Sequence, residues 1–160
     1  MAKIFILVSV LFHLHILVNG QNNKKDIEVR VLSDLAFGSF VTGTSGGTVT
    51  ITPQGDRTVT APVIGLALSP VSSAEFEIIS QGRPWIQFII NEPAILYRSG
   101  GGGSIEITNF TTDKSSNPFR ATGGNNPDVF RVGATLNVQN ITVNPPGSYA
   151  GTFTVTFIEQ

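Results

Sequence analysis

Apolar and polar residues alternate along much of this chain, and this period of two is the feature that most constrains its fold. Near the end of the chain the alternate positions are Tyr149, Gly151, Phe153, Val155 and Phe157. Threonine or alanine fills the positions between them. Residues 130–139 repeat the pattern, with apolar side chains from Phe130 to Val138. Because successive side chains of a strand point to opposite faces, each segment predicts a strand with one buried and one solvated face.

Shorter segments follow the same rule, and glycine-rich or proline-rich turns separate them. The alternating segments are 27–31, 48–52, 74–78 and 105–108. Residues 63–68 and 85–90 are more continuously apolar, which predicts central strands that are covered more fully. Turn residues gather at 43–47, 53–56, 81–84, 100–103, 125–128 and 144–147. Eight or nine short strands at this spacing predict an all-β fold. We favour an antiparallel immunoglobulin-like β-sandwich over a small barrel.

The first twenty residues break from this pattern and predict a signal peptide. One early lysine, Lys3, precedes an apolar run from Ile4 to Val18, and the segment ends with Asn19 and Gly20. These are the parts of a secretory leader, with cleavage expected before Gln21. A membrane anchor is the alternative, but fifteen apolar residues fall short of the roughly 20 that span a bilayer. We therefore expect no membrane span in the mature chain.

The remainder divides into an N-terminal segment with the first strand, residues 21–34, and one sandwich domain, residues 35–160. The chain has no cysteine, so core packing rather than disulfides must stabilise the exported protein. Removing Lys3 leaves nine of the ten basic side chains against eleven acidic ones. This balance does not favour nucleic acid as a partner, because nucleic-acid binding needs a clustered basic surface.

Catalytic chemistry has few candidate residues in the expected mature chain. Both histidines, His13 and His15, lie in the leader. Residues 43–47 match the pattern G-x-S-x-G, but a serine nucleophile needs a histidine base, so we interpret this segment as a hairpin turn. Glu75 and Glu77 share the solvated face of a strand, where a raised pKa for acid catalysis is not expected. We predict no enzyme, no catalytic residue and no cofactor.

Two further groups of residues suggest ligands. Asn125, Asn126 and Asp128, with Asp113 nearby in the sequence, carry the oxygen atoms that calcium prefers, but their spacing is not that of an EF-hand loop. We interpret them as loop residues and predict no metal site. Trp85 and Tyr97 are the candidate ligand-binding residues, because exposed aromatic rings can stack on a sugar; packing at the sandwich edge is the alternative for Trp85.

The chain resembles a secreted bacterial family, the domain of unknown function numbered forty-four zero two. The resemblance runs from about Leu35 to Phe157, and two segments near the end carry it best. The first is Phe130-Arg131-Val132-Gly133-Ala134-Thr135-Leu136 and the second runs from Gly147 to Val155. Weaker support comes from residues 35–38, 46–51 and 53–57. The resemblance implies a pilin-like or spore-coat-like immunoglobulin-type sandwich, non-enzymatic, in the periplasm or on the outer surface of a Gram-negative bacterium.

Two functions from different classes follow. The first is a structural or adhesive surface protein, a pilin-like subunit that binds itself or other surface subunits by strand addition. Residues 21–31 could donate such a strand to a neighbour, or they could pair within their own domain. The second is a carbohydrate-binding module with a glycan as its partner, served by Trp85 and Tyr97.

Overall fold

The computed structural model describes residues 6–8, 27–124 and 126–160, and these contain fourteen strands and no helix. The predicted leader, residues 1–20, lies outside the described residues except for Ile6–Val8. The strands are β1 (Ile6–Val8), β2 (Glu28–Ser33), β3 (Gly38–Val41), β4 (Gly47–Ile51), β5 (Arg57–Val59), β6 (Ile64–Leu66), β7 (Ala74–Ile79), β8 (Trp85–Ile90), β9 (Ala94–Arg98), β10 (Ser104–Thr112), β11 (Phe119–Arg120), β12 (Asp128–Val138), β13 (Gly147–Ala150) and β14 (Val155–Glu159). The prediction of an all-β, sandwich-like fold is confirmed.

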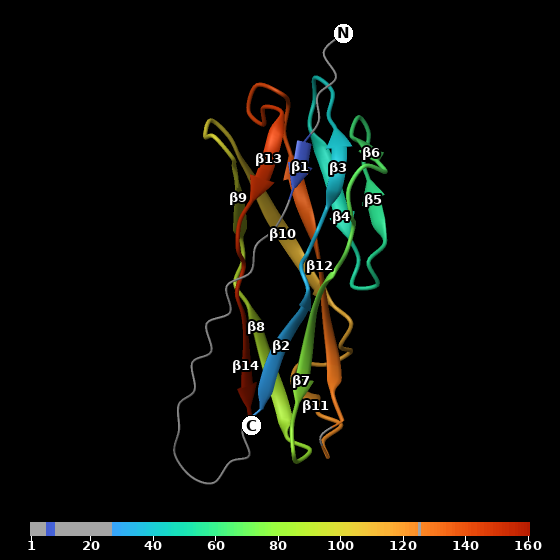
Figure 1. Ribbon diagram of the computed structural model, residues 1–160, viewed down its shortest axis with the longest axis vertical. Helices are drawn as coiled ribbons and strands as arrows, with labels where there is room; N and C mark the ends of the chain where they lie inside the picture. Colours follow the sequence, from blue (N-terminus) through green and yellow to red (C-terminus); the bar gives the residue numbers. More distant parts are fainter. Residues whose placement is uncertain (1–5, 9–26, 125) are drawn as a thin grey trace.

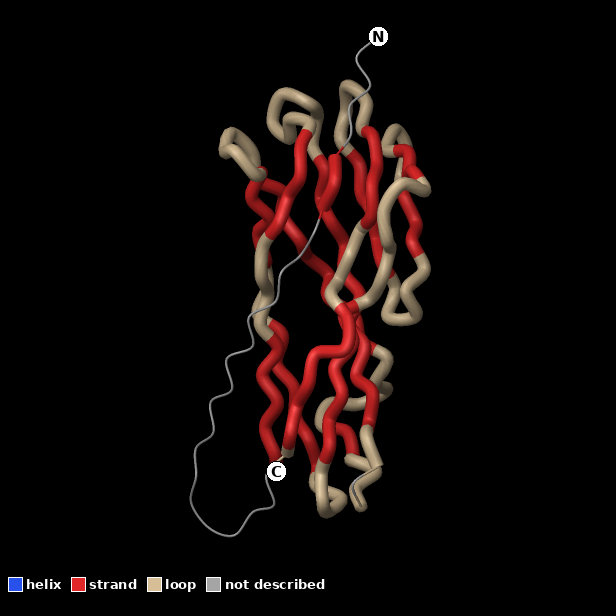
Figure 2. The backbone as a smooth tube through the Cα atoms, in the orientation of Figure 1, coloured by secondary structure: helices blue, strands red, loops and turns tan. Residues whose placement is uncertain are grey.

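The strands form an elongated sandwich with two halves (Figures 1 and 2). One sheet of eleven strands has the order β2-β7-β12-β10-β9-β13-β1-β3-β6, with β4 paired to β12 and β5 paired to β4. A second sheet has three strands in the order β11-β8-β14. We call the part of Figure 1 with β1, β3–β6, β9 and β13 the upper half, and the part with β2, β7, β8, β11 and β14 the lower half.

The long strand β12 joins the halves because it has a different partner along each part of one edge. Its first residues, Asp128–Val132, pair with β7, and Ala134–Val138 pair with β4. Gly133 lies at the change of partner, and a Cβ atom there would collide with the carbonyl oxygen of Ile51. The absence of a side chain therefore lets β4 approach the spine of the sandwich closely.

Five phenylalanines fill the core of the lower half between its two sheets. The ring of Phe130 is central: its centroid lies 4.8 Å from that of Phe88 and 5.0 Å from that of Phe157. Phe76 and Phe119 lie against the same ring at 6.3 and 6.1 Å. Phe130 is completely buried. Inclined aromatic pairs at these separations contribute attraction beyond the area that they bury.

The C-terminal segment, predicted as one strand, is two strands in different sheets. β13 belongs to the large sheet and β14 to the small one, and residues 151–154 connect them. Gly151 packs against the carbonyl oxygen of Ile95, where a Cβ atom would collide with it. The alternating pattern is nevertheless correct for burial, because Tyr149, Phe153 and Val155 are all buried. The strand count exceeds eight or nine partly because long extended segments divide in this way.

Two other sequence predictions need correction. Residues 63–68, predicted as a central strand, contain the edge strand β6, which pairs only with β3 and leaves Ile64 60% and Leu68 64% exposed. Residues 43–47, predicted as a hairpin turn, connect β3 to β4, which do not pair with each other. In contrast, β8 is the central strand of its sheet, as predicted for residues 85–90, and Ile86 is completely buried.

Candidate functional site

One short strand, β1, lies between β3 and β13, which are not paired with each other. Residues Ile6, Leu7 and Val8 run parallel to β13, opposite Gly147, Ser148 and Tyr149. The same three residues run antiparallel to β3, opposite Phe40, Ser39 and Gly38. We call the space between β3 and β13 the β3–β13 gap. In Figure 1, β1 fills this gap in the upper half of the sandwich.

One wall of the gap, β13, is fixed by the loop that precedes it. The hydroxyl group of Tyr149 donates a hydrogen bond to the carbonyl oxygen of Pro145 at 2.6 Å, and Tyr149 is completely buried. Burial raises the pKa of Tyr149, although the positive charge of Arg98 acts in the opposite direction. Asn144 is also buried, and its amide group donates to the carbonyl oxygen of Ser104 at 2.6 Å. These contacts bind the loop and β13 to the rest of the upper half.

The edge of β13 that faces away from the gap pairs with β9. Tyr149 and Ala150 lie opposite Arg98 and Tyr97. The amide of Ser99 donates to the carbonyl oxygen of Ser148 at 2.8 Å, so Ser148 directs its backbone towards β9. Since alternate residues of a strand direct their backbone polar groups to opposite edges, Gly147 and Tyr149 direct theirs towards the gap.

The other wall, β3, is held from its far side by its pairing with β6 and by the side chain of Arg57. Nη1 of Arg57 donates to the carbonyl oxygens of Phe37 and Ser39, at 3.2 and 3.1 Å. Nη2 donates to the carbonyl oxygen of Leu66 in β6 at 3.1 Å. The backbone of Ser39 therefore faces Arg57 and β6, whereas Gly38 and Phe40 face the gap. Both walls thus present backbone donors and acceptors to whatever strand lies between them.

Sequence reasoning missed most of this site. The segment with Phe37, Ser39 and Phe40 does not alternate, so the sequence predicts no strand there, and Arg57 stands out only as a residue that follows the turn at 53–56. β9 was also missed, although Ile95 and Tyr97 do alternate with Ala94, Leu96 and Arg98. That period-two signal was available in the sequence.

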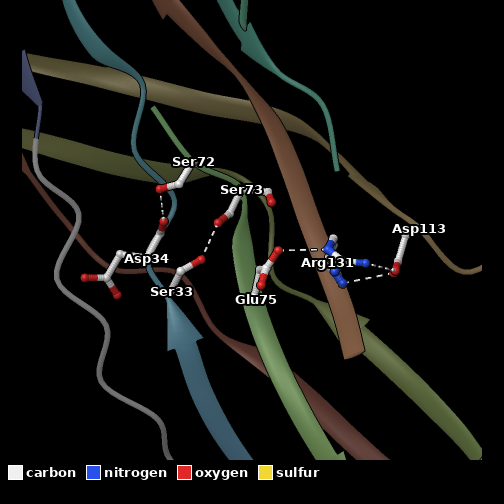
Figure 3. A network of polar contacts seen from close by, with 7 residues as sticks. All are labelled: Ser33, Asp34, Ser72, Ser73, Glu75, Asp113 and Arg131. Atoms are coloured by element: carbon white, nitrogen blue, oxygen red, sulfur yellow. Dashed lines mark hydrogen bonds and ion pairs between the residues drawn. The ribbon is translucent and has the colours of Figure 1, made fainter. Parts of the chain in front are cut away.

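The acidic residues considered for catalysis or calcium binding are engaged in contacts with neighbouring strands and loops. Figure 3 shows Glu75 and Asp113 on either side of Arg131, whose Nε lies 2.8 Å from Oε1 of Glu75. Nη1 of Arg131 lies 3.6 Å from Oδ2 of Asp113, and the pKa of Arg131 is raised, chiefly by the hydrogen bond that it donates to Glu75. Glu77 lies 3.4 Å from Arg30. These ion pairs connect β2, β7, β12 and the loop after β10.

The loop residues with oxygen atoms are also internally bonded. Asp128 accepts hydrogen bonds from the amide and the hydroxyl of Thr122, at 2.8 and 2.7 Å. The side-chain amide of Asn126 donates to the carbonyl oxygen of Gly123 at 3.2 Å. Asn125 lies outside the described residues. Among the residues that are described, no group of three histidine, cysteine or acidic side chains is arranged to hold a metal ion.

The two aromatic residues predicted to bind a ligand lie in different sheets and are not brought together. Trp85 begins β8 in the lower half and is 45% exposed. The guanidinium carbon of Arg120 lies 5.6 Å from the centroid of its ring. Tyr97 lies in β9 of the upper half, opposite Ala150 and Ser104, and is 63% exposed. Each ring is available separately to a ligand.

The fold defines the chain as an all-β sandwich domain whose large sheet takes in a strand from its own extreme N-terminus. Residues 27–158 match the family described as Domain of unknown function (DUF4402), and the chain belongs to that family. No curated protein and no solved structure matches the chain. Within the described part of the chain there is no helix long and apolar enough to cross a membrane.

Proposed function

We propose that this protein is exported by a Gram-negative bacterium and acts as a non-enzymatic structural or adhesive subunit, of pilin-like type, in the periplasm or on the cell surface. The observation that carries the proposal is the position of β1. This strand belongs to the segment that has the composition of a secretory leader, and it occupies a place inside the sandwich. An exported chain that begins at Gln21 lacks that strand and has two adjacent strand edges to offer to a partner.

The rest of the molecule suits a binding and building role. Its strands are tied together by backbone pairing and by ion pairs such as Glu75–Arg131, and its two sheets by aromatic packing. Unpaired strand edges are surfaces to which an extended segment of another chain can add. Domains that assemble by strand addition use main-chain hydrogen bonds for affinity and side-chain pockets for specificity.

The export proposal is tested by expressing the full chain, with its own first twenty residues, in a Gram-negative host. We expect the periplasmic or surface fraction to contain a protein whose intact mass corresponds to residues 21–160. A matched variant, Leu11→Arg, interrupts the apolar run with a charge and should remain in the cytoplasm at full length. A full-length wild-type protein that stays in the cytoplasm would contradict the proposal.

A carbohydrate-binding module is the second candidate, favoured by the exposure of Trp85 and Tyr97. Under this alternative, binding of an oligosaccharide changes the fluorescence of Trp85, the single tryptophan of the chain. Trp85→Ala and Tyr97→Ala then weaken binding separately, because the two rings lie in different sheets. A broad glycan panel that leaves the fluorescence unchanged and shows no bound glycan argues against this candidate.

A further inference from the structure

Removal of the leader changes the sandwich at one place, the β3–β13 gap. β1 is the only described strand between β3 and β13, and its three residues pair with both. Neighbouring strands lie roughly 4.8 Å apart, so losing β1 leaves two edges about 10 Å from each other. Backbone groups of Gly38, Phe40, Gly147 and Tyr149 then lose their partner strand. Such an edge pair is a template for one incoming strand.

Both walls are anchored independently of β1. Arg57 and β6 hold β3, while β9 and the Tyr149–Pro145 hydrogen bond hold β13. These anchors come from residues 57–150, which the exported chain retains. The gap therefore keeps its walls when the leader is absent.

The register defines the chemistry of the strand that fits. Positions 6 and 8 lie opposite Phe40 and Tyr149, which are both completely buried, so these positions belong to the inward-facing register. Position 7 lies opposite Ser39 and Ser148, on the other face. Ser39 is buried and its hydroxyl is hydrogen-bonded to that of Ser69, whereas Ser148 is partly exposed. A fitting strand therefore has apolar residues two positions apart, and it runs parallel to β13.

The segment Ile27–Val31 has this pattern, with Ile27, Val29 and Val31 alternating with Glu28 and Arg30. In its own sandwich the segment contributes to β2, an edge strand that pairs with β7 alone. Val31 is 38% and Leu32 52% exposed, so this edge is only partly buried. A strand that moves from β7 into a gap exchanges pairing along one edge for pairing along two.

While it stays paired with β7, the segment lies away from the gap of its own molecule. Figure 1 places the start of β2 at the bottom of the lower half and the gap in the upper half. Ten Cα–Cα steps lead from Glu28 to Gly38, about 33 Å of extended chain. With β2 in place, the six residues 21–26 that precede Ile27 reach only about 21 Å, so this tail does not reach the gap either. Donor and acceptor lie at opposite ends of one sandwich, an arrangement that generates open, head-to-tail assemblies rather than closed dimers.

We propose that the β3–β13 gap of the exported chain accepts residues Ile27–Val31 of a second copy, parallel to β13, with Ile27, Glu28 and Val29 replacing Ile6, Leu7 and Val8. The copies then assemble head to tail. The proposal rests on the proposed function only in requiring that the leader be removed.

Cysteine pairs test the register, because the natural chain contains no cysteine. Glu28→Cys with Ser148→Cys places two thiols on neighbouring strands of different copies, within the spacing that a disulfide needs. We expect the processed protein to form a ladder of disulfide-linked dimers and larger species on oxidation. The matched control pairs Glu28→Cys with Thr152→Cys, an exposed position just beyond β13, and should give at least tenfold less ladder. Equal amounts of ladder, or monomer in both variants, overturn the proposal.

A peptide of residues 3–10 with a lysine tail tests whether the gap exists, independently of whether a second copy of the chain fills it. The same peptide with Leu7→Cys should form a disulfide with the Ser148→Cys chain, and the unmodified peptide should reduce the ladder in proportion to its concentration. If the peptide forms the disulfide but no ladder appears, the gap exists and the proposal that a second copy fills it is wrong. If the processed protein gives neither the peptide disulfide nor the ladder, the gap itself does not exist, and the export proposal is unaffected. If the chain is not exported, the proposed function fails, and the same tests on a chain expressed from Gln21 still judge the gap.

Discussion

In the lower half of the sandwich every strand comes from residues beyond Ile27, whereas the upper half is completed by β1 from residues 6–8. The lower half closes by packing five phenylalanine rings between two sheets. The upper half closes by inserting a strand between β3 and β13. The two halves of one domain therefore differ in whether residues beyond Ile27 supply all of their strands. In the exported chain that we propose, the lower half would keep all its strands and the upper half would have a vacant strand position.

The largest expected effect comes from Phe130→Ala, which removes the central ring of the lower half. We expect the free energy of unfolding of the processed protein to fall by about 3–5 kcal/mol, as for other large-to-small changes in a packed core. Urea denaturation measures this loss. Ile89→Ala, in β8 of the same lower half but 45% exposed, should cost less than about 1 kcal/mol. Similar losses in the two variants would show that the aromatic cluster does not hold the lower half together.

Arg57→Lys examines the upper half by loosening one wall of the gap. The lysine keeps the charge but cannot hold the carbonyl oxygens of Phe37, Ser39 and Leu66 together with a planar fork. We expect a loss of about 2 kcal/mol in the free energy of unfolding, together with weaker binding of the residue 3–10 peptide. Denaturation and peptide titration are the two measurements. A loss of stability with unchanged peptide affinity would show that Arg57 stabilises the fold but does not shape the gap.

Tyr149→Phe affects the second wall and has a smaller effect. It leaves the carbonyl oxygen of Pro145 without its donor, which should cost about 1–2 kcal/mol at neutral pH. Because burial raises the pKa of Tyr149, the folded state opposes ionisation of the phenol. The stability that the phenol group of Tyr149 contributes is fully present below the unfolded pKa of about 10 and is lost as the pH rises through the folded pKa. The difference between wild type and Tyr149→Phe should therefore shrink in alkali. A difference that stays constant from neutral pH into alkali would contradict this account.

Asp34→Asn should produce the smallest change, at the junction of the halves. Desolvation raises the pKa of Asp34, so ionising this carboxyl group opposes folding. The side chain is exposed, and solvent screening limits the effect to less than about 0.5 kcal/mol. The asparagine variant should be slightly more stable at neutral pH and equal to wild type below about pH 4. Thermal melts across this range measure the difference, and a less stable variant at neutral pH would show that the carboxylate has a favourable contact.

The strands that could be predicted are those in which one face is buried and the other is solvated along the whole segment. β12, β7 and β10 meet this condition, and their alternation identified them. β6 misled the prediction because its apolar residues are exposed at an edge, so composition did not report burial. The division of residues 149–157 also escaped notice, since the alternating pattern continues across residues 151–154 while the backbone changes sheets.

The candidate site was harder to predict because it is made of pairing between distant segments. Alternation identified residues 27–31 as strand-forming, and the leader composition was evident in residues 1–20. Nothing in either segment indicates that Ile6–Val8 pairs with β3 and β13. The role of Arg57 is equally hidden, because its partners are backbone carbonyl oxygens, which every residue carries. Trp85 and Tyr97 stay predicted ligand residues, now as two separate rings.

Amide hydrogen exchange at the two walls tests the central idea most directly. The comparison is between a chain that begins at Gln21, held as a monomer at low concentration, and the same chain saturated with the residue 3–10 peptide. We predict that Gly38, Phe40, Gly147 and Tyr149 exchange rapidly in the free chain and slowly with peptide, while lower-half amides such as that of Phe130 remain protected in both. Full protection of the four wall amides in the free monomer would show that the exported chain has no vacant strand position.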